Sequence, residues 1–189
     1  MTDIRKVGVI GAGVMGSGIA AHMANAGLPV VLLDVVPDGA NARNVLADAA
    51  VARLLKTNPA PLMHKQNARR IVTGNIEDDL DRLGECDWII EAIIENLDAK
   101  RDLYARIETE RKTGSIVSSN TSTIPLEKLT EDLPERFCKD FAITHFFNPP
   151  RYMRLLEVVA GPQTHPNVLQ SLRIFGDQTL GKSVVTCKD

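Results

Sequence analysis

The stretch KVGVIGAGVMGSGIAAHMANAGLPVVLLD, residues 6–34, combines three patterns that together decide the fold. Its first five residues form a short apolar run, which predicts a β-strand. Residues 17–27 are rich in small side chains and predict a helix, and the apolar residues 30–33 predict a second buried strand that ends at Asp34. A strand, a helix and a further strand in close succession are typical of a βαβ unit, whose two strands lie parallel in one sheet.

The connection between the first strand and the helix is Gly11-Ala12-Gly13-Val14-Met15-Gly16, which has the spacing G-x-G-x-x-G. In a βαβ unit, Gly11 permits the tight turn out of the strand, and Gly16 allows the helix to lie close to it. Gly13 has no side chain, so the backbone can approach a pyrophosphate, which the free N–H groups and dipole of the helix N-terminus would bind. The motif therefore predicts a dinucleotide-binding site.

Asp34 indicates which dinucleotide binds. It lies 23 positions after Gly11, close to the spacing of roughly 20 residues expected for the carboxylate that binds the adenosine ribose. A carboxylate would repel a 2′-phosphate, and no arginine occurs at residues 35–38. We therefore expect NAD as the cofactor in preference to NADP.

Strands and helices alternate along the rest of the chain. This alternation predicts an α/β fold, a doubly wound, mostly parallel Rossmann-type sheet with helices on both faces, and one domain over residues 1–189. Ligands of such sheets bind at the carboxyl ends of the strands. Further strands are predicted at 71–74, 87–90, 115–118, 141–144, 155–159 and 183–186, and the longer helices at 38–57, 96–112 and 166–180.

Composition excludes several classes of function. A net charge of −2 and an aromatic content of 4% argue against a nucleic-acid partner. No apolar run approaches the roughly 20 residues of a membrane-spanning helix, and the first strand begins too early to leave room for a signal peptide. The three cysteines lack C-x-x-C spacing, which argues against a metal site and a disulfide framework. We therefore expect a cytoplasmic protein.

Candidate catalytic residues lie in the second half of the chain. Among the four histidines, His145 alone follows directly on a predicted strand and precedes a turn, so it is the best candidate for a base that accepts a hydroxyl proton. Glu157 could hold the other ring nitrogen if the chain forms a hairpin about residues 147–154, and Ser122 could contact the substrate oxygen. From spacing alone, a structural histidine in a turn, a surface glutamate and a capping serine explain these residues equally well.

Four further motifs follow the glycine motif in order: Glu91-Ala92-Ile93-Ile94-Glu95-Asn96, Ser119-Asn120-Thr121-Ser122, His145-Phe146-Phe147-Asn148-Pro149 and Leu155-Leu156-Glu157-Val158. With them, nearly the whole chain resembles the NAD-binding domain of the L-3-hydroxyacyl-CoA dehydrogenases of fatty-acid β-oxidation. The resemblance implies oxidation of a (3S)-3-hydroxyacyl-CoA thioester to the 3-ketoacyl thioester, with the hydride passing to NAD. It implies His145 as the base, Glu157 as its partner, Ser122 beside substrate and nicotinamide, and cofactor contacts at Glu95, Lys100 and Asn148.

In this family a largely helical domain follows, which shapes the acyl-CoA cleft and supplies much of a homodimer contact. The chain ends at Asp189, without a position for that domain's active-site asparagine. The resemblance therefore implies that this stretch is the cofactor half of a longer enzyme and has little activity alone. Two other functions stay open: a related dehydrogenase of hydroxy acids or sugar acids, and a non-catalytic NAD-binding module.

Overall fold

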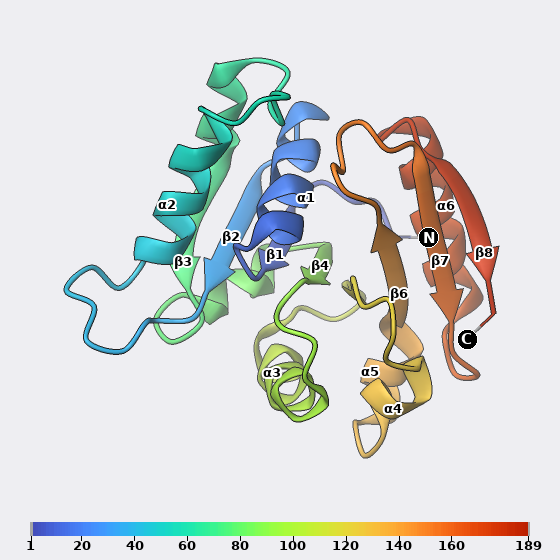
Figure 1. Cartoon of the computed structure of the whole chain (residues 1–189). Helices are drawn as coiled ribbons and strands as arrows, with labels where there is room; N and C mark the ends of the chain where they lie inside the picture. The colour runs from blue at the N-terminus through green and yellow to red at the C-terminus, as the bar shows by residue number, and fades with distance from the viewer. Residues whose placement is uncertain (1, 189) are drawn as a thin grey trace.

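A computed structural model describes residues 2–188, which form one eight-stranded sheet with helices on both faces (Figure 1). The strand order is β3-β2-β1-β4-β5-β6-β7-β8. Pairing is parallel from β3 to β6, antiparallel between β6 and β7, and parallel again between β7 and β8. The predicted doubly wound, mostly parallel sheet is confirmed. The strands are β1 (Val7–Ile10), β2 (Val30–Asp34), β3 (Ile71–Asn75), β4 (Trp88–Glu91), β5 (Ile116–Ser119), β6 (Phe141–Phe146), β7 (Leu155–Ala160) and β8 (Ser183–Cys187).

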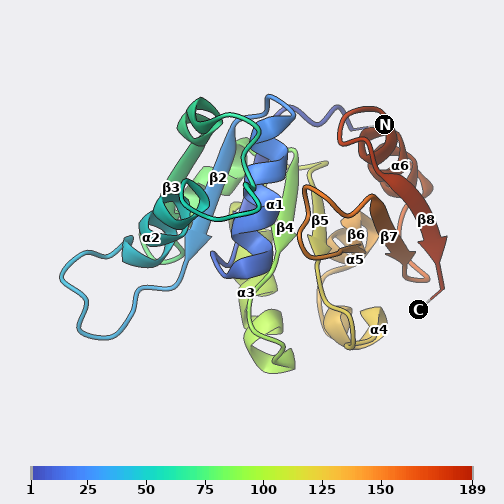
Figure 2. The ribbon, with the colours of Figure 1, turned by 45° about the horizontal axis from the view of Figure 1, so that its top comes forward.

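The helices divide into two groups, each of which buries one face of the sheet in a separate apolar cluster. Figure 1 shows the first two helices beside β1 and β2, and the helix Leu97–Glu110 away from them on the other side of the sheet. Figure 2 gives a second view of the same arrangement. One face carries α1 (Val14–Asn25), α2 (Val45–Leu54) and α6 (Pro166–Gln178). The other carries α3 (Leu97–Glu110), α4 (Leu126–Thr130) and α5 (Glu135–Asp140), and two short 3₁₀ helices are η1 (Lys65–Arg70) and η2 (Leu80–Glu85).

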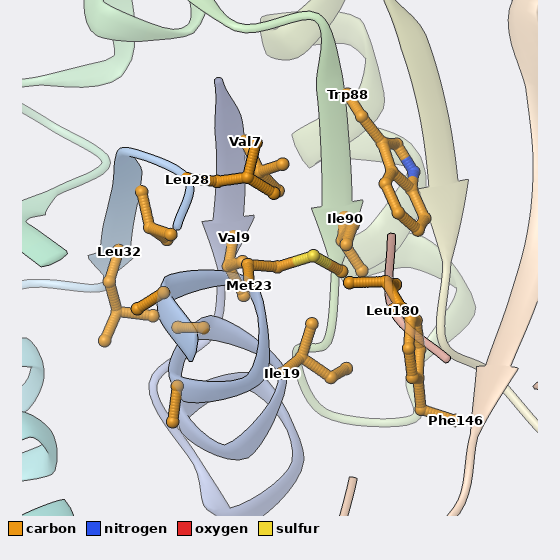
Figure 3. Close-up of a cluster of buried hydrophobic side chains, with 14 of the residues drawn as sticks. Val7, Val9, Ile19, Met23, Leu28, Leu32, Trp88, Ile90, Phe146 and Leu180 are labelled. Atoms are coloured by element: carbon orange, nitrogen blue, oxygen red, sulfur yellow. The ribbon is translucent and has the colours of Figure 1, made fainter. Parts of the chain in front are cut away.

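The first cluster fixes α1 against the sheet. Ile19 and Met23 of α1 point toward Val9 and Ile90 of the two central strands (Figure 3), and all four side chains are fully buried. Trp88 of β4 is fully buried in the core, and its indole N–H donates to the Ser118 hydroxyl at 2.9 Å. The helix N-terminus is thereby held at the carboxyl end of β1.

Two helix predictions were wrong at their starts. The first helix begins at Val14 rather than Ser17, so the end of the glycine motif already belongs to the helix. Glycine is a weak helix former, so the sequence does not indicate this first turn. The second was predicted at 38–57, whereas α2 spans only Val45–Leu54. Gly39 has a positive φ of 69°, and the connection before α2 is instead fixed by an Arg43–Asp78 ion pair and a hydrogen bond from Asn75 to Asn44.

The chain forms the hairpin about residues 147–154 that a contact between His145 and Glu157 requires. This hairpin connects β6 to the antiparallel β7, and two cations fasten its loop to the rest of the protein. The ammonium of Lys182 donates to the carbonyl oxygen of Met153 at 2.7 Å and to that of Pro150. The guanidinium of Arg151 donates to the carbonyl oxygens of Leu62 and Ala60.

No helix within residues 2–188 is both long enough and apolar enough to cross a membrane.

Candidate functional site

The centre of the sheet holds a cleft of about 690 Å³ at the carboxyl ends of the strands. It opens between the adjacent strands β1 and β4. From β1 the chain adds β2 and β3 on one side of the sheet, and from β4 it adds β5 and β6 on the other side. Such a reversal of strand order is where doubly wound sheets bind their ligands. The cleft walls include Gly11, Gly13, Met15, Asp34, Ala92, Glu95, Lys100, Arg106 and Asn120.

The three glycines of the motif meet different surroundings. A β-carbon on Gly11 would lie 2.4 Å from the carbonyl oxygen of Ala92, and Gly11 also has a φ of +100°. A β-carbon on Gly16 would lie 1.8 Å from the carbonyl oxygen of Gly11. At Gly13, the N-cap of α1, it would meet no protein atom within 4 Å. Crowding thus explains Gly11 and Gly16, whereas Gly13 faces open space that suits an approaching pyrophosphate.

Asp34 lies at the carboxyl end of β2 and lines the cleft, as predicted. Its Oδ2 accepts a hydrogen bond from the backbone N–H of Ala12 at 2.6 Å, and its Oδ1 accepts one from Val35 at 2.7 Å. These bonds fix the carboxylate beside the glycine turn. Because each carboxylate oxygen can accept more than one hydrogen bond, the group can still bind ribose hydroxyls.

A buried ion pair forms the inner wall of the cleft. The Lys100 ammonium lies 2.6 Å from Oε1 of Glu91, and both side chains are almost completely buried. The Glu91 carboxylate also accepts hydrogen bonds from the hydroxyls of Tyr104 and Ser119, at 2.6 and 2.7 Å. Burial, and then the adjacent Glu91 carboxylate, raise the pKa of Tyr104 well above its ordinary value, so its hydroxyl keeps its proton. These donors compensate a carboxylate that would otherwise be costly to bury.

Glu95 connects this wall to the loop after β5. Its Oε2 lies 3.3 Å from the Lys100 ammonium, and its Oε1 accepts hydrogen bonds from the hydroxyls of Thr121 and of Thr123, the latter at 2.9 Å. Partial burial acts to raise the pKa of Glu95, but the bonds from these hydroxyls and from Lys100 act in the opposite direction. Their combined effect is larger, so the pKa of Glu95 lies below its ordinary value. A carboxylate in the cleft thus fixes the loop that carries Ser122.

His145 and Glu157 lie opposite each other in the antiparallel pairing of β6 and β7. The Nδ1 atom of the imidazole is 2.9 Å from Oε2 of the carboxylate, and the two side chains are 24% and 34% exposed. The imidazole also packs against Phe147 with 4.5 Å between ring centroids. The packing on Phe147 and the bond to Glu157 together orient the ring. Because Nδ1 faces Glu157, Nε2 is the nitrogen that faces away from it.

A second, smaller hollow of about 270 Å³ surrounds the pair, and Ser122 lines it together with His145 and Glu157. The structure therefore brings together the three residues predicted as catalytic. The predicted cofactor residues that line the cleft are Gly11, Gly13, Val14, Met15, Asp34, Glu95 and Lys100, whereas Ala12 and Gly16 do not line it and Ser122 lines the second hollow. Asn148 is exposed in the hairpin loop and lines neither hollow.

The sequence did not reveal the contacts of three side chains at the site. The guanidinium of Arg53 on α2 donates to the carbonyl oxygen of Ala12 in the glycine turn at 3.2 Å. Glu91, at the end of β4, accepts hydrogen bonds from the buried side chains of Lys100, Tyr104 and Ser119. Asn120 accepts a hydrogen bond from the backbone of Phe146. Only Glu91 carries a signal in the sequence, since a carboxylate directly after an apolar strand must find partners when buried.

Comparisons with known proteins give one consistent result. Residues 6–189 match the family model described as "3-hydroxyacyl-CoA dehydrogenase, NAD binding domain". The chain is 48% identical to a probable 3-hydroxyacyl-CoA dehydrogenase of Bacillus subtilis and 44% identical to a putative fatty acid oxidation complex trifunctional enzyme of Rickettsia felis. A crystal structure of 3-hydroxybutyryl-CoA dehydrogenase from Escherichia coli superposes with a TM-score of 0.83 at 26% identity.

These matches cover nearly all of this chain but only part of the other proteins. They include 98%, 99% and 98% of this chain, and 25%, 26% and 38% of the Bacillus, Rickettsia and Escherichia chains respectively.

Proposed function

The chain belongs to the 3-hydroxyacyl-CoA dehydrogenase family, of which it is an NAD-binding domain, and from this premise we propose that it also carries the catalytic base of the reaction. The proposed reaction oxidises a (3S)-3-hydroxyacyl-CoA thioester to the 3-ketoacyl thioester. The single observation that supports the base is the 2.9 Å contact between Nδ1 of His145 and Glu157 at the carboxyl end of β6.

The proton of the substrate hydroxyl passes to Nε2 of His145. Glu157 holds the Nδ1–H of the ring, fixes the tautomer that leaves Nε2 free to accept, and stabilises the imidazolium that results. The hydrogen on the substrate carbon leaves with its electron pair as a hydride, which NAD accepts when it is bound. Loss of the proton and the hydride converts the C–OH group into C=O, so atoms and electrons balance.

Ser122 binds the reacting oxygen beside the base. It is exposed in the hollow that holds His145 and Glu157, and its neighbours Thr121 and Thr123 are both fixed by Glu95. A hydroxyl can donate to the substrate oxygen in either oxidation state. Glu95 thus acts on the substrate side through the loop, in addition to its place in the cofactor cleft.

The proposed cofactor contacts follow the cleft from one end to the other. Asp34 accepts hydrogen bonds from the adenosine ribose hydroxyls, and the backbone N–H groups that follow Gly13 bind the pyrophosphate. Glu95 and Lys100 lie toward the nicotinamide ribose. Asn148 is proposed as a contact on the resemblance alone.

The substrate, the assembly and the location of the whole protein are also proposals. The hollow around His145 is small and open, so we propose that residues of a further domain complete the acyl-CoA cleft and provide a homodimer contact. The name of the Rickettsia relative supports a role in fatty-acid oxidation. The free cysteines support a cytoplasmic location.

The test is an assay of acetoacetyl-CoA reduction by NADH with the full-length protein, next to the same assay of the His145→Gln variant. Turnover in the unmodified protein that falls at least about 100-fold in the variant supports the proposal. A protein that binds NADH and reduces no 3-ketoacyl thioester would contradict the substrate. Oxidation of a sugar acid would then identify the related dehydrogenase, and no turnover of either substrate would identify a binding module.

A further inference from the structure

Asn120 bridges the strands on either side of it at the centre of the site. It directly follows β5, and its backbone N–H donates to the carbonyl oxygen of Glu91 at the end of β4, at 2.8 Å. Its side-chain Oδ1 accepts a hydrogen bond from the backbone N–H of Phe146 at 2.9 Å, next to His145 on β6. The residue is therefore held by both neighbouring strands.

These bonds determine which way the amide faces. A primary amide has one oxygen, which accepts, and one NH₂ group, which donates. Because a backbone N–H can be satisfied only by an acceptor, Oδ1 must face Phe146, and the NH₂ group faces away from it. Within residues 2–188 this NH₂ group has no hydrogen-bond partner, and Asn120 is half-buried in the wall of the cofactor cleft.

Asn120 also lies where the two hollows of the site meet. It lines the cleft that contains Gly13 and Ala92, whereas the next residues, Thr121 and Ser122, line the hollow around His145. Hydride transfer requires the nicotinamide to lie between the cofactor cleft and a substrate whose oxygen is beside the base. The ring carries a carboxamide, and its carbonyl oxygen is a hydrogen-bond acceptor.

We propose that the NH₂ group of Asn120 donates to the carboxamide oxygen of the nicotinamide and thereby sets the orientation of the ring. The inference rests on the proposed function in one respect, the location of hydride transfer beside His145. Since Oδ1 is fixed by Phe146, the amide can offer only a donor to the cleft. The same side chain thus couples the position of the ring to the backbone that carries the base.

The test compares two ligands on the 189-residue chain by calorimetric titration: NADH, and ADP-ribose, which lacks the nicotinamide. Asn120→Asp keeps the size of the side chain and an oxygen for Phe146, but removes the donor. We expect the ratio of NADH affinity to ADP-ribose affinity to fall about 10-fold, because a neutral hydrogen bond is lost and a carboxylate then faces the carbonyl oxygen. Any effect of the new charge on the shared ADP-ribose part cancels in this ratio.

Asn96→Asp is the matched control. Asn96 is exposed beside Glu95 and caps α3 by accepting from the N–H of Ala99, which an aspartate does equally well. This variant adds the same charge near the cleft and should leave the affinity ratio within about twofold of the unmodified chain.

A second measurement needs no variant. An NAD analogue with a 3-acetylpyridine ring keeps the carbonyl and should bind like NAD, whereas a 3-methylpyridine analogue should bind about as weakly as ADP-ribose. Equal binding of both analogues, or an unchanged affinity ratio in a folded Asn120→Asp variant, would overturn the inference and leave the proposed function intact. If neither NADH nor ADP-ribose bound the unmodified chain, the cofactor assignment itself would be wrong.

Discussion

Nδ1 of His145 lies 2.9 Å from Oε2 of Glu157 because the two residues are direct partners in the pairing of β6 with β7. Antiparallel neighbours on one face of a sheet have their β-carbons about 4.5–5.5 Å apart, within reach of a side-chain hydrogen bond. Strand pairing, rather than a flexible loop, therefore orients the imidazole.

This arrangement predicts that the two residues act as a unit. In the full-length protein, His145→Gln should lower kcat by about 10²–10⁴ while NAD affinity changes little. Glu157→Gln should also lower kcat, and the double variant should be no slower than His145→Gln alone. Steady-state kinetics and an NAD titration on each variant measure this. Additive losses in kcat, or near-normal turnover without His145, would contradict the pairing. His64→Asn is the control variant and should leave kcat unchanged, because asparagine keeps a side-chain acceptor at the N-cap of η1.

The glycine motif offers a second prediction, in which one alanine substitution lowers the stability of the fold and another lowers the affinity for NAD. Gly16→Ala places a β-carbon 1.8 Å from a backbone oxygen, so it should lower the free energy of unfolding by roughly 1–3 kcal/mol or more. Gly13→Ala meets no protein atom, so stability should change by less than about 1 kcal/mol, while NAD affinity falls at least about 10-fold. Denaturant unfolding and calorimetry on both variants measure the effects. Normal NAD binding by Gly13→Ala would place the pyrophosphate elsewhere.

Asp34 is predicted to determine cofactor choice. Asp34→Ala should weaken NAD binding by about 1.5–3 kcal/mol, because a hydrogen bond to a charged group is lost, and should narrow the preference for NAD over NADP. Asp38→Ala, which removes an exposed carboxylate from the same connection, should change neither affinity. Titration with both cofactors is the measurement. Equal affinities of the unmodified chain for NAD and NADP would refute the role of Asp34.

His22 is predicted to make the fold sensitive to acid. Burial, and then the charges of Lys182 and Arg151, lower the pKa of His22 to about 4 in the folded state, from 6.5 when exposed. The unfolded chain therefore binds the additional proton first, and stability falls as the pH drops from about 6.5 to about 4, by on the order of 3 kcal/mol. His22→Leu should remove this part of the pH dependence. Urea unfolding of both proteins at pH 7, 5 and 4 tests it, and parallel stability curves would contradict the assignment.

The 189-residue chain is predicted to bind NAD yet to oxidise hydroxyacyl-CoA negligibly. The cofactor cleft is built entirely from its own residues, whereas the hollow at His145 is small and open. Without more of the substrate enclosed, the positioning that can lower a barrier by roughly 7–11 kcal/mol is lost. Calorimetry with NAD and an acetoacetyl-CoA assay on the same sample provide the measurement. Turnover typical of a whole dehydrogenase would show that this chain holds a complete acyl-CoA site.

The strands could be predicted from the sequence more accurately than the helices, for a physical reason. Buried parallel strands are continuous apolar runs, and the predicted strand at 30–33 with its terminal Asp34 matches β2 to within one residue. Alanines recur throughout residues 38–57, but Gly39, Asn41 and Asn44 are weak helix formers and mark the first part as a connection. Nothing local shows that Asn75 and Asp78, which are distant in the sequence, hold the first part of that segment as a loop.

The site could be predicted as a set of residues but not as a network. Chain position alone placed Gly11, Asp34 and His145 at the carboxyl ends of strands; the first two line the cofactor cleft and His145 lines the second hollow. The environment of Lys100 could not be predicted, because its burial depends on Glu91 from another element. The contact of Asn120 could not be predicted either, because its partner is the backbone N–H of Phe146, which every residue type except proline carries.

The hairpin that joins β6 and β7 also determines which length changes the site can tolerate during evolution. An insertion in loop 147–154 leaves His145 opposite Glu157, because the buried faces of β6 and β7 specify their register. An insertion of one residue inside β7 ahead of Glu157 turns that carboxylate to the opposite face of the sheet. Natural variants of this domain can therefore gain or lose loop residues between the two partners and keep the contact of His145 with Glu157, whereas the spacing within each strand must stay constant.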